Sequence, residues 1–398
     1  MTTKVDNLVV GGGIGGLATA LGIAGSGHRV HLLERNADFT EIGAGLQFGP
    51  NASRALDQLG VLQDVLPSAV RPLRAVIMDA YSGAPLTVLE LGDKFEQRYG
   101  YPYLVLHRHD LLEILVKHCR ENDLITLETG RNVVDSEVGP DGAAVMCSDG
   151  TRYEARALVA ADGLHSVLRR HVTSDTVQCS GYAAYRGTIP IEAAGWAAGS
   201  TDVILWIGPD IHLMQYPVRR SALYNQVAVF RSPRYAAGLR EPDQWGRPDE
   251  LDQAFAPACE RVRAAVAKID RTRYWPMFDR APIESWAHQS LLLIGDAAHP
   301  MLQYLGQGAC QALEDAVELG EQFRANRVHD NKSREAAYLG FQQRRVPRAS
   351  RCQTVARPWG DLWHTSDPLL IEVRNLLFAK RTQDDYAELD WLYAADAR

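Results

Sequence analysis

The sequence lacks several features that mark particular classes of protein. Only six of its 398 residues are cysteines, and no two of them form a C-x-x-C pair. We therefore expect neither a metal site nor a disulfide framework, and we expect reduced thiols in the cytoplasm. The formal net charge is −7, whereas general nucleic-acid binders are usually basic, so no nucleic-acid partner is expected.

Long hydrophobic runs are also missing. The most membrane-like stretch, residues 8–24, is interrupted by glycines, and no basic segment followed by an apolar one resembles a signal peptide. Neither a membrane span nor an export signal is expected, which favours a cytoplasmic protein. There is no internal repeat, and 398 residues are many for a single core, so two domains are expected.

A glycine-rich stretch near the start of the chain carries the strongest signal. Gly11, Gly13 and Gly16 match the pattern G-x-G-x-x-G, and Glu34 follows the last of them by 18 residues. The flanking residues predict a strand, a helix and a second strand, at 8–10, 17–24 and 29–33. Such glycines let a pyrophosphate approach a helix N-terminus, and the acid can accept a hydrogen bond from a ribose hydroxyl. We interpret the stretch as a dinucleotide-binding βαβ unit; the alternative is a glycine-rich turn in an ordinary α/β core.

Two later strands each end in an aspartate and a glycine. An apolar run at 157–161 leads into Asp162 and Gly163, and another at 291–294 leads into Gly295 and Asp296. An aspartate at the carboxyl end of a strand in a doubly wound sheet faces the crevice where ligands bind. A helix then begins at 306–309 and reaches about residue 321, and its first amides could face an anion of the cofactor.

The remaining patterns predict the elements around these motifs. The loop 41–50 holds three glycines, which indicates close approach of the backbone to a ligand. Asp110 is the expected N-cap of a helix at 111–119, and Arg108 before it either contacts a cofactor or forms a surface ion pair. The other expected elements are a helix at 50–59, a hairpin at 71–91 turning at Gly83, a strand at 103–106, an antiparallel sheet formed by 182–189, 203–207, 212–217 and 224–230, a helix near 251–269, and helices at 333–351 and 369–378.

Two further patterns leave alternatives open. Period-two alternation puts His212, Met214 and Tyr216 on one face of a strand, which is either a wall of an active site or a half-buried surface. The helix at 333–351 carries arginines at 344, 345, 348 and 351. They indicate either a patch for anions or nucleic acid or, as we expect in an acidic chain, a face directed to solvent or to a neighbouring domain.

Taken in order, the three glycine–acid motifs resemble the cofactor motifs of the FAD-dependent aromatic hydroxylases, the group A flavoprotein monooxygenases. The likeness runs nearly end to end and is carried by GAGLQFGPNA from Gly43, GYAAYRGT from Gly181, HLMQYPV from His212, NQVAVF from Asn225, WPMFDRAPIESW from Trp275, LQYLGQGA from Leu302 and LWH from Leu362. It implies an α/β fold of the p-hydroxybenzoate hydroxylase type, with a Rossmann-like FAD-binding domain and an antiparallel-sheet substrate domain. The expected boundaries are 1–70, 100–175 and 285–360 for the first domain, 71–99 and 176–284 for the second, and 361–398 for a C-terminal helical segment.

The resemblance also implies roles for individual residues. Tightly bound, non-covalent FAD is expected to contact Gly11, Gly13, Ile14, Gly15, Gly16, Glu34, Arg35, Gln47, Arg108, Asp162, Gly163, Asp296, Pro300, Gly306, Gly308 and Ala309. NADH or NADPH is expected to visit a surface groove transiently, because the chain has no second G-x-G-x-x-G. Gln303 stands where many relatives have proline, and Cys310 where they have asparagine, so no role of that asparagine is carried over. A homodimer is implied as well.

The implied reaction is hydroxylation of a phenolic aromatic acid with NAD(P)H and O₂, through a flavin C4a-hydroperoxide. Because the attack is electrophilic, the phenol must share its proton with a base, and His212 is the candidate. Gln303 would orient the hydroxyl, and Tyr216, Leu46 and Met301 would bind the substrate. Leu46 and Met301 are also apolar candidates for excluding water. The expected substrate is 3-hydroxybenzoate and the product gentisate. The alternatives are salicylate or 6-hydroxynicotinate hydroxylation, a halogenase or reductase, and a non-catalytic FAD-binding protein.

Overall fold

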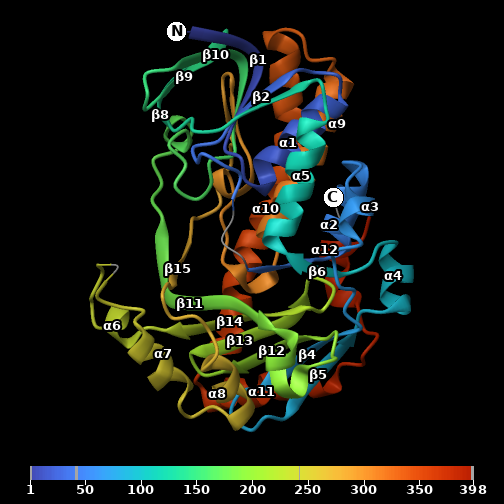
Figure 1. Cartoon of the computed structure of the whole chain (residues 1–398), viewed down its shortest axis with the longest axis vertical. Helices are drawn as coiled ribbons and strands as arrows, with labels where there is room; N and C mark the ends of the chain where they lie inside the picture. Colours follow the sequence, from blue (N-terminus) through green and yellow to red (C-terminus); the bar gives the residue numbers. More distant parts are fainter. Residues whose placement is uncertain (1, 41–43, 242, 396–398) are drawn as a thin grey trace.

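Two large β-sheets lie at opposite ends of the long axis of the molecule (Figure 1). The computed structural model describes residues 2–40, 44–241 and 243–395. Within these residues the first sheet has eight strands: six follow the order β16-β17-β10-β1-β2-β7, β9 pairs with β10, and β8 pairs with β9. Their bounds are β1 Thr2–Val10, β2 Val30–Leu33, β7 Ile125–Glu128, β8 Val133–Gly139, β9 Gly142–Cys147, β10 Arg152–Ala160, β16 Ala287–His288 and β17 Leu291–Leu293.

The three strands that precede the glycine–acid motifs are neighbours in this sheet. β1, β10 and β17 run parallel, with Val10 opposite Ala160 and Ala160 opposite Leu293. Their last residues are apolar and buried, as a parallel sheet requires. The carboxyl ends of the strands therefore bring the glycine turn, the 162–163 pair and the 295–296 pair to one edge of the sheet, as the sequence predicted.

Long helices pack along the first sheet, and two of them touch through glycines. A Cβ on Gly22 would lie 2.2 Å from the carbonyl oxygen of Ala316, and a Cβ on Gly320 would lie 2.4 Å from that of Gly22. Only glycine at both positions lets these two helix backbones approach so closely. The helices of this half are α1 Ile14–Gly25, α2 Pro50–Gln58, α3 Leu62–Val65, α5 Arg108–Arg120, α9 Gly308–Asn326 and α10 Asn331–His364.

The start of α5 differs from the prediction. The helix begins at Arg108, and Asp110 is not its N-cap but lies in its first turn. The Asp110 carboxylate accepts a hydrogen bond from Arg219 at 2.7 Å, and this distant partner gave no local signal. α9 and α10 are longer than predicted, because α10 continues through Pro347 and Pro358 to residue 364.

The second sheet has seven strands in the part of the chain that the structure describes, in the order β15-β11-β14-β13-β12-β4-β5. The hairpin β4–β5 is confirmed, with Gly83 at a φ of +74°. β4 and β12 pair in parallel, however, so the sheet is mixed and not wholly antiparallel; a long connection, and not a tight turn, joins these two strands. The bounds are β4 Arg74–Asp79, β5 Pro85–Glu90, β11 Gln178–Pro190, β12 Val203–Gly208, β13 Ile211–Val218, β14 Leu223–Arg231 and β15 Trp275–Asp279.

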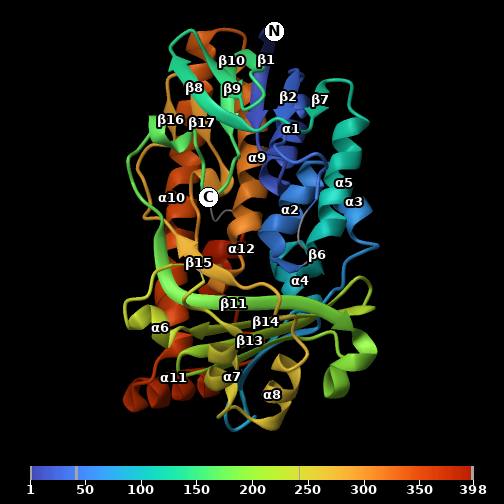
Figure 2. The same ribbon diagram turned by 60° about the vertical axis from the view of Figure 1, so that its left-hand side comes forward.

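Short helices cover the outer face of the second sheet, and its other face is turned toward the first sheet (Figure 2). The single helix expected near 251–269 is two helices, α7 Pro248–Phe255 and α8 Glu260–Val266; Pro257 between them has no N–H with which to continue the first. The remaining elements are β3 Gly45–Phe48, β6 Leu104–His107, α4 Asp93–Tyr99, α6 Pro233–Ala236, α11 Pro368–Lys380, α12 Asp390–Tyr393 and short 3₁₀ turns, among them Gly295–Ala297 and Gln303–Leu305. No helix among the described residues is long and apolar enough to span a bilayer.

Candidate active site

A cavity of about 550 Å³ is lined by residues of both sheets. Its lining combines the turns after β1, β10 and β17, the start of α9, and the inner face of the second sheet. The C-terminal segment closes part of it through Leu389, Leu392 and Tyr393. A more open hollow of about 850 Å³ lies among residues such as Lys4 and Glu137, but it contains none of the predicted site residues. We therefore place the candidate active site in the first cavity.

The glycine turn after β1 meets two different requirements. Gly13, Ile14 and Gly15 line the cavity. Gly11 and Gly16 are needed for packing, because a Cβ on Gly16 would lie 1.8 Å from the carbonyl oxygen of Gly11. No described side chain caps the first amides of α1, so this helix N-terminus remains available to an anion.

Glu34 directly follows β2 and supports this turn. Its carboxylate accepts hydrogen bonds from the backbone N–H groups of Gly12 and Asn36, both at 2.8 Å. Glu34 is buried and Arg35 is exposed, and neither belongs to the cavity lining. Contact of these two residues with a cofactor remains a prediction.

The 162–163 pair contributes one residue to the lining. Gly163 lines the cavity, whereas Asp162 lies behind it and accepts a hydrogen bond from the Val167 N–H at 2.9 Å. The second carboxylate oxygen of Asp162 is buried without a partner among the described residues, and burial raises the pKa of this side chain. A hydrogen-bond donor on a ligand would satisfy it.

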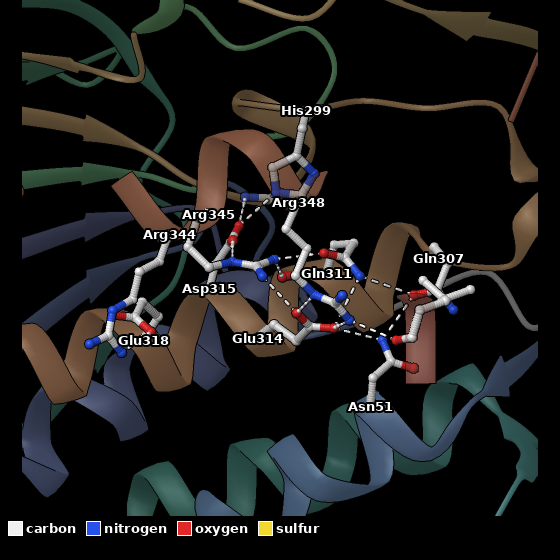
Figure 3. Close-up of polar contacts among 12 residues, drawn as sticks. Asn51, His299, Gln307, Gln311, Glu314, Asp315, Glu318, Arg344, Arg345 and Arg348 are labelled. Carbon is white, nitrogen blue, oxygen red and sulfur yellow. Dashed lines mark hydrogen bonds and ion pairs between the residues drawn. The ribbon is translucent and has the colours of Figure 1, made fainter. Parts of the chain in front are cut away.

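The turn that carries Asp296 is fixed from behind by a buried polar network (Figure 3). The Asp315 carboxylate on α9 accepts hydrogen bonds from the Gly295 N–H at 2.9 Å, from His299 Nε2 at 2.7 Å and from Arg345 Nε at 2.7 Å. Burial alone would raise the pKa of Asp315, but the facing His299 and Arg345 outweigh it and lower the pKa to about 2. The network holds the turn against α9 and leaves Asp296 in the cavity lining.

The arginines of α10 do not form the surface that we expected. Arg345 and Arg348 are buried between α9 and α10, where both bind the Glu314 carboxylate (Figure 3). They therefore face another helix of the chain and form neither a nucleic-acid patch nor a solvated face; Arg348 also donates to the carbonyl oxygens of Trp391 and Leu392 in the C-terminal segment. Arg344 and Arg351 of the same helix are exposed to solvent, as we expected. The acidic partners lie on another helix, so the α10 sequence alone could not reveal this.

The start of α9 and the loop before it also line the cavity, through Gly306 in the loop and Gly308 and Ala309 in the helix. The side chain of the N-cap residue, Gln307, makes no capping hydrogen bond, so it does not block these amides. Pro300, just before this loop, is buried outside the lining, and its carbonyl accepts a hydrogen bond from a glutamine of α10 at 3.1 Å.

Three side chains of β13 contribute to the part of the lining that the second sheet supplies. His212, Met214 and Tyr216 all lie there, as the period-two pattern predicted. His212 is buried, and its Nδ1 lies 2.7 Å from Nε2 of His364, the last residue of α10. Burial, reinforced by the second imidazole, lowers the pKa of His212 well below its usual value. His212 is therefore neutral at pH 7, and one of its ring nitrogens can accept a proton.

His364 is equally shielded. Burial lowers its pKa to about 3, and its ring stacks on Tyr182 at 4.6 Å between ring centroids. Two neutral imidazoles share a single hydrogen in the bond between them. When His212 Nδ1 donates that hydrogen, His212 Nε2 is left as an acceptor; this tautomer is the one that a base requires.

The glycines of the loop after residue 40 pack against tyrosines. A Cβ on Gly45 would lie 2.4 Å from the ring of Tyr216, and a Cβ on Gly49 would lie 2.3 Å from the ring of Tyr393. At both positions the close neighbour is thus a side chain of the chain itself, although Gly45 also lines the cavity. Gly43 lies outside the described residues.

Five more predicted residues belong to the lining: Leu46, Gln47, Arg108, Met301 and Gln303. Gln47 accepts a hydrogen bond from the Tyr103 hydroxyl at 2.8 Å. Arg108 is the first residue of α5, where burial lowers its pKa and the charge of Asp296 opposes this effect. The structure thus brings Arg108 and Asp296, predicted from separate motifs, into one site.

Sequence reasoning missed several residues of this site. Tyr304 and Trp363 surround His212 with ring centroids 5.7 and 5.4 Å away, and Arg186 on β11 lines the same cavity. The only available signal for Arg186 was a charged residue in the middle of a strand that is otherwise uncharged. Nothing in the sequence pairs His364 with His212, because 152 residues separate them.

The lining suits a flavin dinucleotide. It extends from the glycine turn of β1 to His212, and two helix N-termini without side-chain caps contribute to it. Gly13 and Gly15 present no side chain where a pyrophosphate would lie, and Asp296 offers an acceptor for ribityl hydroxyls.

Comparisons with known proteins agree with this chemistry. A family model described as an FAD binding domain matches residues 4–354. Two relatives named 3-hydroxybenzoate 6-hydroxylase align over almost the whole chain: one from Klebsiella oxytoca is 36% identical over 99% of this chain and 97% of its own, and one from Polaromonas naphthalenivorans is 35% identical over 97% and 95%. The structure of Klebsiella pneumoniae HpxO complexed with FAD and uric acid aligns with a TM-score of 0.81 and 27% identity, covering 96% of this chain and 93% of that one.

The fold and the site thus define an FAD-binding flavoprotein, and the chain belongs to the FAD binding domain family. Within that class it is an FAD-dependent aromatic hydroxylase, a group A flavoprotein monooxygenase, as the order of its motifs predicted.

Proposed function

We propose that this chain hydroxylates 3-hydroxybenzoate to gentisate with NAD(P)H and O₂. The observation that carries the proposal is the buried, neutral His212 in the cavity whose opposite end bears the FAD motifs. The choice of substrate is supported by the two relatives of that name, which align over at least 95% of both chains. Gln303, which stands where many related hydroxylases have proline, also favours this choice.

The turns after β1, β10 and β17 and the start of α9 would hold FAD, which would supply the redox chemistry with NAD(P)H and O₂. What the chain itself adds is control of the substrate proton. A phenol with a pKa near ~10 is mostly protonated at neutral pH, whereas electrophilic attack needs an electron-rich ring. His212 Nε2 accepts the phenolic proton, while His212 Nδ1 donates to His364 Nε2 and holds the required tautomer.

Neighbouring residues orient the substrate and keep it dry. The Gln303 amide lies in the lining after the Asp296 turn, where it can hydrogen-bond the substrate hydroxyl. Tyr216 lies two side chains along the same strand face as His212 and can hydrogen-bond the acid. Leu46, Met301 and other apolar side chains of the lining exclude water, which protects the activated oxygen from unproductive release as H₂O₂.

The test is a panel assay on the FAD-loaded protein. NADH consumption, H₂O₂ and identified products are measured with 3-hydroxybenzoate, salicylate, 6-hydroxynicotinate and, as a control without a hydroxyl, benzoate. We expect gentisate in near-stoichiometric yield from 3-hydroxybenzoate alone. His212→Ala should retain FAD and NADH oxidation but lose product by about 100-fold or more, the effect of removing a general base. Efficient turnover of another acid would show that this acid, and not 3-hydroxybenzoate, is the substrate. Tight FAD binding without NADH oxidation stimulated by any of the acids would refute the proposed enzymatic function.

A further inference from the structure

Arg186 lies in the cavity lining with no counter-charge among the described residues. It stands in β11 on the face of the second sheet that also carries His212 and Tyr216. Its Nε is buried without a hydrogen-bond partner, and no carboxylate in the described part of the chain contributes to its surroundings. This isolation is unusual, because buried charges in proteins are normally paired.

The surroundings of Arg186 add positive charge and remove water. Its guanidinium lies over the Trp275 ring at 4.2 Å, and Arg273 lies over the same ring at 5.3 Å. Burial, together with the charges of Arg108 and Arg273, lowers the pKa of Arg186 to about 10. The side chain is still cationic at pH 7, so the cavity holds a desolvated positive charge that an anion would stabilise.

The cofactor does not account for this charge. The FAD pyrophosphate is expected at the glycine turn of β1, on the first sheet, whereas Arg186 belongs to the second sheet. The described carboxylate of the lining, Asp296, sits on the turn after β17. We propose that Arg186 binds the carboxylate of the aromatic acid and thereby selects phenolic acids over uncharged phenols; this inference rests on the proposed function.

The strand register gives this arrangement its spacing. Arg186 is opposite Val227 on β14, and Val227 is opposite Met214 on β13. His212 and Tyr216 flank Met214 on the same strand face. Because two strand spacings separate β11 from β13, their backbones lie about 10 Å apart. An aromatic ring between them can therefore meet a guanidinium at its carboxylate and the imidazole at its hydroxyl, and arginine binds carboxylates through two parallel hydrogen bonds.

The test compares a charged ligand with a neutral one of the same shape. Binding of 3-hydroxybenzoate and of 3-hydroxybenzyl alcohol to the FAD-loaded protein is measured through the flavin absorbance change, for wild type, Arg186→Gln and Arg186→Lys. We expect Arg186→Gln to weaken binding of the acid by about 10- to 100-fold and that of the alcohol by less than about 3-fold. Arg186→Lys should recover part of the loss. Arg273→Gln, which removes the neighbouring exposed cation, is the matched control and should change both affinities by less than about 3-fold.

Three results would overturn the assignment. The first is equal binding of the acid by wild type and Arg186→Gln, and the second is an equal loss of affinity for acid and alcohol. The third is an unchanged affinity for the acid in Arg186→Gln together with either a loss of FAD or a raised KM for NADH. The proposed function is tested separately by product formation in the wild type. If no panel acid is hydroxylated, that function fails, and the binding of plain benzoate to wild type and Arg186→Gln still decides whether Arg186 binds a carboxylate.

Discussion

Replacing His364 by phenylalanine tests whether the histidine pair controls the substrate proton. Phenylalanine keeps a flat ring against Tyr182 but removes the nitrogen that lies 2.7 Å from His212 Nδ1. His212 then has a buried nitrogen without a partner, a state that costs about 1–3 kcal/mol. If the whole penalty falls on the tautomer that accepts the substrate proton, the rate of product formation drops by about 5- to 150-fold. FAD binding should persist, because neither histidine belongs to the turns that we propose to bind FAD.

The assay records gentisate, NADH consumption and H₂O₂ under saturating substrate. We expect NADH oxidation by the His364→Phe variant to continue while the product per NADH falls and H₂O₂ rises. His364→Gln, whose amide oxygen can accept from His212 Nδ1, should recover most of the yield. A fluorinated 3-hydroxybenzoate with a more acidic phenol should suffer a smaller loss, because it needs less help from a base. An equal loss for both substrates would mean that His364 only supports packing, and an unchanged yield would remove it from the mechanism.

The buried network behind the Asp296 turn yields two further predictions. Arg345→Gln should lower the free energy of unfolding by about 3–5 kcal/mol and weaken FAD binding, because it leaves the Asp315 and Glu314 carboxylates without one of their cationic partners. The control is Arg344→Gln, whose wild-type side chain is 47% exposed and whose loss should cost less than about 1 kcal/mol. Thermal unfolding with and without added FAD measures both effects. The pKa values of Asp315 and Glu314 are both lowered to about 2, so their stabilising effect is complete above about pH 4.5 and is lost as the pH falls toward 2. The melting temperature should therefore drop over that range in wild type and drop less steeply in Arg345→Gln, and parallel curves would contradict the assigned pairing.

The sequence predicted those parts of the molecule that depend on local patterns. The glycine turn, the two Asp–Gly strand ends and the alternation at His212 each specify a backbone shape or a strand face within a few residues, and the parallel register then brings them together. Asp110 was assigned as a cap because its residue type favours that position, and the tertiary contact with Arg219 was invisible. The buried arginines of α10 were misread for the same reason, since a charged helix face looks the same whether water or another helix covers it.

Helix α10 connects the two halves of the chemistry. At 34 residues it spans about 50 Å, and it passes from the first sheet to the second. Near its middle Arg345 holds the acids that fix the Asp296 turn, and at its end His364 binds the proposed base, His212. The Asp296 turn and the proposed base are thus tied to one continuous helix, although they belong to different sheets. Because the distance between a hydroxylating flavin and the activated ring carbon must be held closely, this shared helix explains how two different sheets can present one reaction site.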